Sequence, residues 1–159
     1  MDLWKFHRAA ALNKKEVIMF KKILIAFDGS PQSYKAFEFA LNMSKLCPVA
    51  APEITVLSVA QPPEPADIVE VDAIIDSATQ HYEGLFEKLR EKAKERNLEI
   101  KTEVVVGHPA DQIVRYAKEK NCDMVIVGQR GKSKIKSWLL GSVSKRVSTY
   151  SPCTVMIVK

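Results

Sequence analysis

The sequence "KKILIAFDGS", Lys21–Ser30, is a short apolar run that ends in Asp-Gly-Ser. This pattern is typical of a buried β-strand that stops in a turn. Pro31 follows, and proline is favoured at the first position of a helix because its fixed φ suits the helix and that position needs no N–H donor. The apolar residues beyond it recur at helical spacing: Ala36, Phe37, Ala40 and Leu41. The stretch therefore predicts a strand, a turn and a helix.

Four further apolar segments have the length and composition of buried strands. They are "EITVLSVA" at 53–60, "LEIKTEVVVG" at 98–107, "CDMVIVG" at 122–128 and "PCTVMIVK" at 152–159. Between them we expect a long amphipathic helix over 71–93, preceded by a proline-rich loop at 61–67, and a helix that begins at Pro109. A short helix, capped by Ser142, would carry Val143, Val147 and Tyr150. Strands and helices thus alternate along the chain.

Apolar strands that alternate with amphipathic helices indicate a parallel sheet, because each right-handed crossover lays its helix on the sheet. We therefore predict an α/β fold, a doubly wound five-stranded parallel sheet with helices on both faces, of the Rossmann-like kind. In such folds, ligands bind beyond the carboxyl ends of the strands, where the strand order reverses. The turns that follow the first and fourth strands, at Asp28 and Gly128, are the predicted location of a site.

The remaining features of the chain narrow its class. We expect residues 19–159 to form one domain and residues 1–18 to be a poorly ordered extension or, with Leu3, Trp4 and Phe6, a docking helix. No apolar run approaches the roughly 20 residues of a membrane helix, so we predict a cytoplasmic protein without membrane contact. The three cysteines are far apart and lack metal-site spacing, so we interpret them as buried or incidental thiols: Cys47, Cys122 and Cys153.

Positive charge gathers in one part of the sequence. The chain has 24 Lys and Arg against 19 Asp and Glu, for a net charge of +5. Six basic residues and no acidic ones lie between Gln129 and Tyr150: Arg130, Lys132, Lys134, Lys136, Lys145 and Arg146. This distribution favours an anionic partner for that segment.

The same segment has a distinctive glycine spacing. Gly128 ends a strand, Gly131 follows after two residues, and Gly141 follows after nine more, directly before Ser142. Glycines allow a ligand to approach the backbone closely, and the N–H groups at a helix N-terminus attract anions. The pattern predicts a backbone cradle for phosphates, with hydroxyl donors from Ser142 and Ser144. A P-loop is excluded because its two glycines need four residues between them, and the Rossmann G-x-G-x-x-G fingerprint is missing after the first strand.

Gly-x-x-Gly, nine residues and then Gly-Ser, after an apolar strand, resembles the nucleotide-binding signature of the universal stress protein family. The segments "KKILIAFDGS", "VGHPADQIVRYAKEKNCDMVIVGQRG" and "SPCTVMIVK" resemble that family's other landmarks in order, and the resemblance covers Lys21–Lys159. The intact signature implies the ATP-binding branch of the family.

The resemblance also implies roles for individual residues. The phosphates and ribose would contact Gly128, Gly131, Gly141, Ser142 and Val143. Asp28 would lie near the ribose and any Mg²⁺ that accompanies the phosphates, while Ala26 and Val59 match positions that border the adenine. Ser30, Ser144 and Val127 complete the expected ATP site, although Val127 stands where the family often has Met. Arg130 and Lys132 are candidates for neutralising phosphate charge.

The expected function is that of an ATP-binding regulatory or signalling module in the stress response, with a protein partner that the sequence does not identify. The resemblance further implies a homodimer formed by pairing of the last strand, whose apolar edge needs covering. A slow Mg²⁺-dependent ATPase is the alternative, because Mg²⁺ near Asp28 could polarise a phosphate. Nucleic-acid binding ranks lower, since Trp138 is the lone aromatic of the basic segment up to Arg146. We expect a capping or exposed role, and no catalytic role, for His108.

Overall fold

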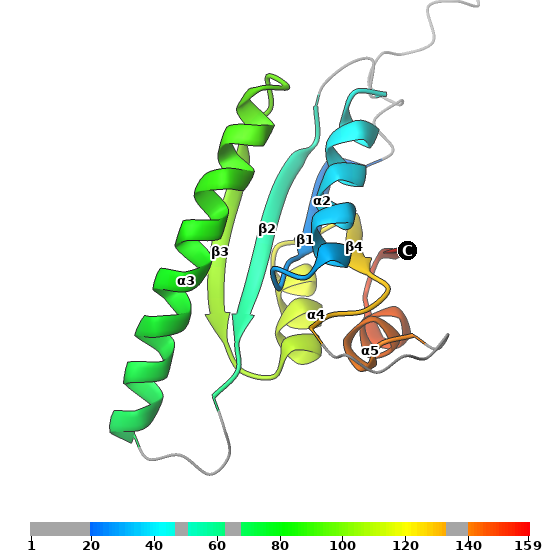
Figure 1. Ribbon diagram of the computed structural model, residues 1–159. Coiled ribbons are helices and arrows are strands. Elements are labelled where there is room, and N and C mark those ends of the chain that lie inside the picture. The colour runs from blue at the N-terminus through cyan, green and yellow to red at the C-terminus, as the bar shows by residue number, and fades with distance from the viewer. Residues whose placement is uncertain (1–19, 47–50, 63–67, 133–139) are drawn as a thin grey trace, which may run out of the picture.

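The computed structural model describes residues 20–46, 51–62, 68–132 and 140–159. The strands are β1 (Lys22–Ala26), β2 (Glu53–Ala60), β3 (Ile100–Val106), β4 (Met124–Gly128) and β5 (Thr154–Val158). The helices of the described part are α2 (Pro31–Ser44), α3 (Ile68–Lys94), α4 (Pro109–Glu119) and α5 (Ser142–Tyr150), as Figure 1 shows. The predicted extension over 1–18, Cys47 and Trp138 lie outside the described residues.

The five strands form one parallel sheet in the order β3-β2-β1-β4-β5. The chain builds outward from β1 through β2 to β3, then returns to the other side of β1 for β4 and β5. The strand order therefore reverses between β1 and β4, where Ile25 pairs with Ile126. The predicted doubly wound α/β fold is confirmed, and the switch point lies between the first and fourth strands.

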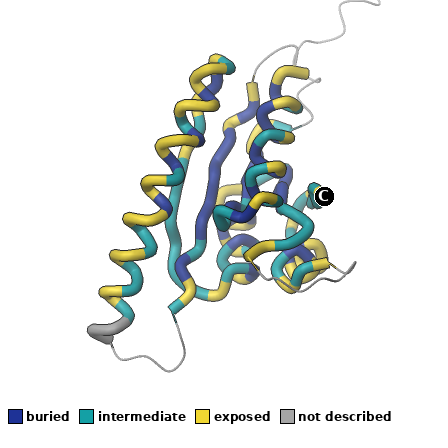
Figure 2. Tube along the Cα trace, viewed as in Figure 1, coloured by how far each residue is buried: buried dark blue, intermediate teal, exposed yellow. Residues whose placement is uncertain are grey.

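Two apolar clusters cover the two faces of the sheet, because successive strand residues point to opposite faces. On one face, Ile23 and Ile25 of β1 pack with Phe37 of α2 and Phe86 of α3. On the other face, Leu24 packs against α4 and α5. Figure 2 shows the resulting pattern, with the central strands buried and the outer sides of the helices exposed. The runs of consecutive apolar residues in β1 and β4, and the largely apolar composition of β2, follow from this double cover.

The turn between β1 and α2 is fixed by its own residues. Gly29 has a φ of 81°, a conformation that glycine adopts without strain. Ser30 is the N-cap of α2, and its Oγ accepts a hydrogen bond from the Ser33 amide at 3.2 Å. Pro31 then opens the helix as predicted. The Asp-Gly-Ser-Pro sequence thus ends the strand and starts the helix within a few residues.

The first residue of α5 and the exposure of its last residue differ from the prediction. Gly141 occupies the N-cap position and Ser142 is the first helical residue, so the predicted cap at Ser142 is wrong. Val143 and Val147 pack against the cluster under α4 and α5, as predicted, and Ser144 is also buried. Tyr150, which was predicted to share that face, is 65% exposed.

No helix among the described residues is long and apolar enough to span a membrane. Cys122 and Cys153 are free thiols that pack against the cluster under α4 and α5. Burial raises the pKa of the Cys122 thiol to about 11. Because the thiolate is the reactive form, this cysteine is a weak nucleophile at neutral pH.

Candidate functional site

A cleft of about 1130 Å³ lies at the carboxyl edge of the sheet. Its floor is formed by the ends of β1, β2 and β4, where Ala26, Val59 and Val127 line it. One wall is the N-terminal half of α3, and the other is formed by the glycine segment after β4 and the start of α5. The volume exceeds the roughly 300–1,000 Å³ of common ligand pockets. Because the ends of β1 and β4 form part of its floor, the cleft lies at the switch point, as the fold class predicts.

The structure brings nearly all of the predicted site residues together in this cleft. Those that line it are Ala26, Asp28, Val59, Val127, Gly128, Arg130, Gly131, Lys132, Gly141, Ser142, Val143 and Ser144. Ser30 does not line the cleft, because its hydroxyl caps α2 and its side chain is buried. Residues that are 100 positions apart in the sequence thus share one surface.

Asp28 ties the two halves of the switch point together. Its Oδ1 accepts a hydrogen bond from the Ser30 amide at 2.9 Å, within the turn after β1. Its Oδ2 accepts one from the Lys132 amide at 3.1 Å, in the glycine segment after β4. The Asp28 carboxylate therefore sets the distance between the two turns that flank the cleft.

Close approach of the backbone explains two of the glycines. A Cβ atom on Gly128 would lie 2.8 Å from the carbonyl carbon of Gln32 in α2, so any side chain would push the helix from the strand. A Cβ atom on Gly131 would lie 2.5 Å from Oδ2 of Asp28. The first glycine permits helix-to-strand packing, and the second leaves room for the Asp28 carboxylate.

The far end of the glycine segment is closed by hydrogen bonds. The Gly141 amide donates to the Gln129 carbonyl at 3.0 Å. The Ser144 hydroxyl lies 2.9 Å from both the Gln129 and the Gly141 carbonyl oxygens. Ser144, expected to donate to a phosphate, thus has carbonyl partners here and is buried.

Ser142 and Val143 begin α5 at the cleft. The first N–H groups of a helix have no intrahelical acceptor and favour an anion.

The charges of the cleft suit a polyanion. Arg130 and Lys132 line it from the glycine segment. Asp28 is the sole acidic residue among the described residues that line the cleft. Mg²⁺ in proteins is commonly held by one or two carboxylates and by the phosphates of a ligand. Asp28 can supply that one carboxylate, and no group of three His, Cys, Asp or Glu among the described residues forms a metal site of its own.

The α3 wall was not predicted from the sequence. It adds several residues to the cleft: Ala73, Ile74, Ser77, Ala78, His81 and Tyr82. Figure 1 shows why, since the N-terminal half of α3 continues past the carboxyl ends of β2 and β3. The signal in the sequence was the apolar stripe at Ile74 and Ala78, which extends beyond the length needed to cover the sheet. Part of that stripe faces the cleft.

His108 lies outside the cleft, at the N-cap position of α4. Its side chain makes no capping hydrogen bond and is exposed. Nδ1 lies 3.7 Å from a carboxylate oxygen of Asp111. This placement agrees with the predicted exposed role.

Comparison with known proteins places the chain among relatives of one kind. A profile of the Universal stress protein family matches residues 19–159. Universal stress protein YxiE of Bacillus subtilis (strain 168) is 35% identical over 155 residues, which cover 89% of this chain and 100% of that protein.

Solved structures show the same fold. The hypothetical protein MJ0577 has a TM-score of 0.75 at 29% identity, over 89% of this chain and 96% of its own. A universal stress protein in complex with cAMP has a TM-score of 0.61 at 22% identity, with 89% and 98% covered. A universal stress protein family protein from Arabidopsis thaliana with AMP bound has a TM-score of 0.61 at 20% identity, with 87% and 91% covered.

Proposed function

Because the chain belongs to the universal stress protein family, we propose that it binds ATP in the cleft at the switch point. Bound nucleotide would make it a regulatory or signalling module of the stress response. The observation that carries the proposal is the convergence of Gly128, Gly131 and the N-terminus of α5 on one cleft lined by Arg130 and Lys132. Backbone N–H groups and cations around a glycine-lined space are the chemistry that polyphosphates require.

Two structural relatives support an adenine nucleotide. One was solved with cAMP and the other with AMP. In this chain, Ala26 and Val59 line the floor of the cleft and offer an apolar surface to a base. The phosphates would then lie toward the glycine segment and α5, where the cations are.

Mg²⁺ would accompany the phosphates and neutralise part of their charge. Asp28 would hold it, and each of its two carboxylate oxygens also accepts a hydrogen bond from one backbone amide, of Ser30 or Lys132. Hydrolysis of ATP is a second candidate. We expect slow turnover or none, because Asp28, the one carboxylate among the described lining residues, already accepts two N–H groups. Rapid Mg²⁺-dependent phosphate release, lost in Asp28→Ala, would reverse the order of the two candidates.

The proposal is tested by denaturing purified protein, identifying any released nucleotide, and then titrating the nucleotide-free protein with ATP, ADP, AMP and GTP in a thermal-shift assay. A ligand present at 100 times its Kd stabilises the folded state by about 2.7 kcal/mol. For a chain of this size that raises Tm by roughly 5–11 °C. No released nucleotide and no shift with any of the four would refute ATP binding. An oligonucleotide that binds with a steep salt dependence would favour the nucleic-acid alternative.

We also propose a homodimer formed through β5. In the described part of the chain, β5 lies at the edge of the sheet and pairs only with β4. Its apolar residues Met156 and Ile157 are partly buried. An unpaired apolar edge attracts a second strand. Light scattering at micromolar concentration should therefore report twice the monomer mass, and a monomer mass would contradict this. The protein partner and the cytoplasmic location stay predictions from the sequence.

A further inference from the structure

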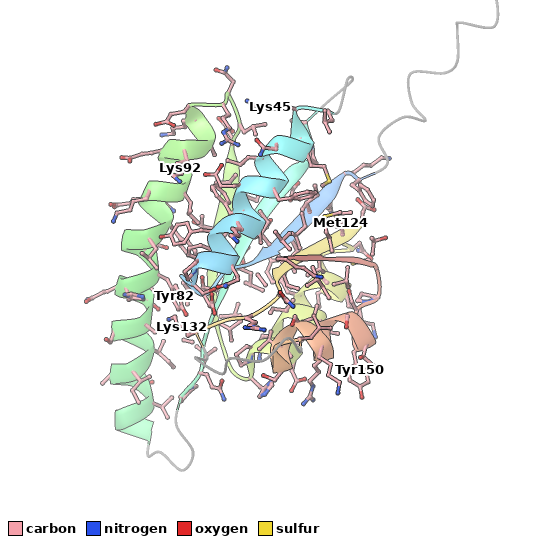
Figure 3. The ribbon with its side chains drawn as sticks, turned by 45° about the vertical axis from the view of Figure 1, so that its right-hand side comes forward. Lys45, Tyr82, Lys92, Met124, Lys132 and Tyr150 are labelled. Atoms are coloured by element: carbon pink, nitrogen blue, oxygen red, sulfur yellow. The ribbon has the colours of Figure 1, made fainter. Side chains whose placement is uncertain are left out.

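A contact crosses the cleft between its two walls. Nζ of Lys132, in the glycine segment, lies 5.4 Å from the ring centroid of Tyr82 in α3. An ammonium group at this distance from an aromatic face is attracted by the ring quadrupole. Figure 3 shows the two side chains together at the carboxyl edge of the sheet. Both residues line the cleft.

Lys132 is held at both ends. Its amide donates to Oδ2 of Asp28 at 3.1 Å, which fixes where the side chain begins. Its ammonium rests over Tyr82, which fixes where the side chain ends. A lysine otherwise moves freely among many rotamers, and ordering it costs side-chain entropy each time it binds a ligand. Here much of that ordering is in place before a ligand arrives.

Tyr82 is itself a rigid support. It is only 7% exposed, and its ring stacks on Phe86 with centroids 6.3 Å apart. Phe86 packs on Phe27 at the end of β1, and Phe27 meets the edge of Tyr34 in α2 at 5.0 Å. The position of the Tyr82 ring is therefore set by an aromatic cluster that joins β1, α2 and α3.

From these contacts we propose that Tyr82 is a positioning residue that holds the Lys132 ammonium in the cleft, and that Lys132 thereby selects nucleotides by their number of phosphates. This inference rests on the proposed function. A cation that is already in position strengthens the binding of ADP and ATP through their added negative charge. It does not strengthen the binding of adenosine, which carries no phosphate. The α3 wall thus acts in ligand selection through its contact with the glycine segment.

The test is isothermal titration of the nucleotide-free protein with adenosine, AMP, ADP and ATP at one salt concentration. Lys132→Met should weaken ATP binding about tenfold or more and leave adenosine binding unchanged, because a charge-assisted contact is lost. Lys45→Met is the matched control. It removes the same charge at the end of α2, far from Lys132 in Figure 3, and should leave the ratio of ATP to adenosine affinity unchanged.

Two variants distinguish the contribution of the Tyr82 ring from that of its hydroxyl group. Tyr82→Phe keeps the ring and should keep the ratio of affinities, whereas Tyr82→Leu should lower it about two- to fivefold. In a Lys132→Met background, Tyr82→Leu should lower the ratio no further, because the residue acts through Lys132. An equal loss in both backgrounds, or an equal loss for adenosine and ATP, would overturn the inference.

Tyr82 is a buried residue of the core, so replacing it with leucine can destabilise the protein. A second measurement is therefore made on the wild type. In the wild type, the side-chain methylene protons of Lys132 should show an upfield ring-current shift by NMR, and those of Lys45 should not. If Tyr82→Leu folds, the Lys132 shift should be absent in that variant. Unshifted Lys132 resonances would overturn the inference. If the nucleotides bind but Lys132→Met leaves the ratio of ATP to adenosine affinity unchanged, this inference is overturned and the proposed function stands. If none of the four ligands binds, the proposed function is overturned as well.

Discussion

Replacing Gly131 with alanine is expected to weaken ATP binding at least tenfold, equivalent to about 1.4 kcal/mol. The new Cβ would lie 2.5 Å from Oδ2 of Asp28 and would force that carboxylate to rotate. The rotation would break the hydrogen bond from the Lys132 amide and release the glycine segment from the turn after β1. The segment would then no longer present its backbone to the phosphates.

The same substitution should cost no more than about 1 kcal/mol of the free energy of unfolding, because Asp28 is only partly buried and its displaced carboxylate can be hydrated. Calorimetric titration with ATP and urea unfolding would measure the two effects. Gly84→Ala is the matched control: Gly84 lies within α3, and a Cβ atom there would meet none of the described residues within 4 Å, so alanine should leave ATP binding unchanged. Equal ATP affinities for Gly131→Ala and Gly84→Ala would contradict the assigned role of Gly131.

Replacing Gly128 with alanine is expected to damage both the fold and the site. The added Cβ would meet the backbone carbonyl carbon of Gln32 at 2.8 Å, and a backbone atom of a helix cannot rotate away as a side chain can. Overpacking of this kind typically lowers the free energy of unfolding by about 1–3 kcal/mol. Since α2 and β4 would move apart next to the turn that holds Asp28, ATP binding should fall with stability.

Chemical unfolding of Gly128→Ala beside Gly84→Ala would test this. Alanine at the helical position should raise the free energy of unfolding by up to about 1 kcal/mol, because glycine is a poor helix former. The two substitutions should therefore have effects of opposite sign. A Gly128→Ala protein as stable as the wild type would show that α2 does not lie close enough to β4 for a Cβ atom at Gly128 to clash with Gln32.

The fold could be predicted because its signals are local. Apolar strands, the turn at Asp28 and proline at the first position of α2 are each set by neighbouring residues, and their alternation leaves few possible topologies. The switch point followed from that topology, so Asp28 and Gly128 could be placed in the same cleft. The cap of α5 could not be placed to the residue, since both Gly141 and Ser142 are acceptable at an N-cap.

The details of the site depend on contacts that the sequence does not contain. Ser30 has the same chemistry as Ser142, but it faces α2 instead of the cleft because its hydroxyl caps the helix. The two amides that bind Asp28 come from segments about 100 residues apart. The contact of Lys132 with Tyr82 depends on how far α3 extends past the sheet, which is a matter of packing and not of periodicity.

Nucleotide binding at the switch-point cleft is tested most directly by an amide NMR titration of the nucleotide-free protein with ATP. We predict that the largest shift changes occur at the backbone amides of Gly128, Gly131, Ser142 and Val143, which line the cleft. The groove between α4 and α5, lined by Arg115, Lys118 and Arg146, serves as an internal reference with basic residues of its own. Shift changes confined to that groove, with the cleft amides unmoved at saturating ATP, would contradict binding at the switch point.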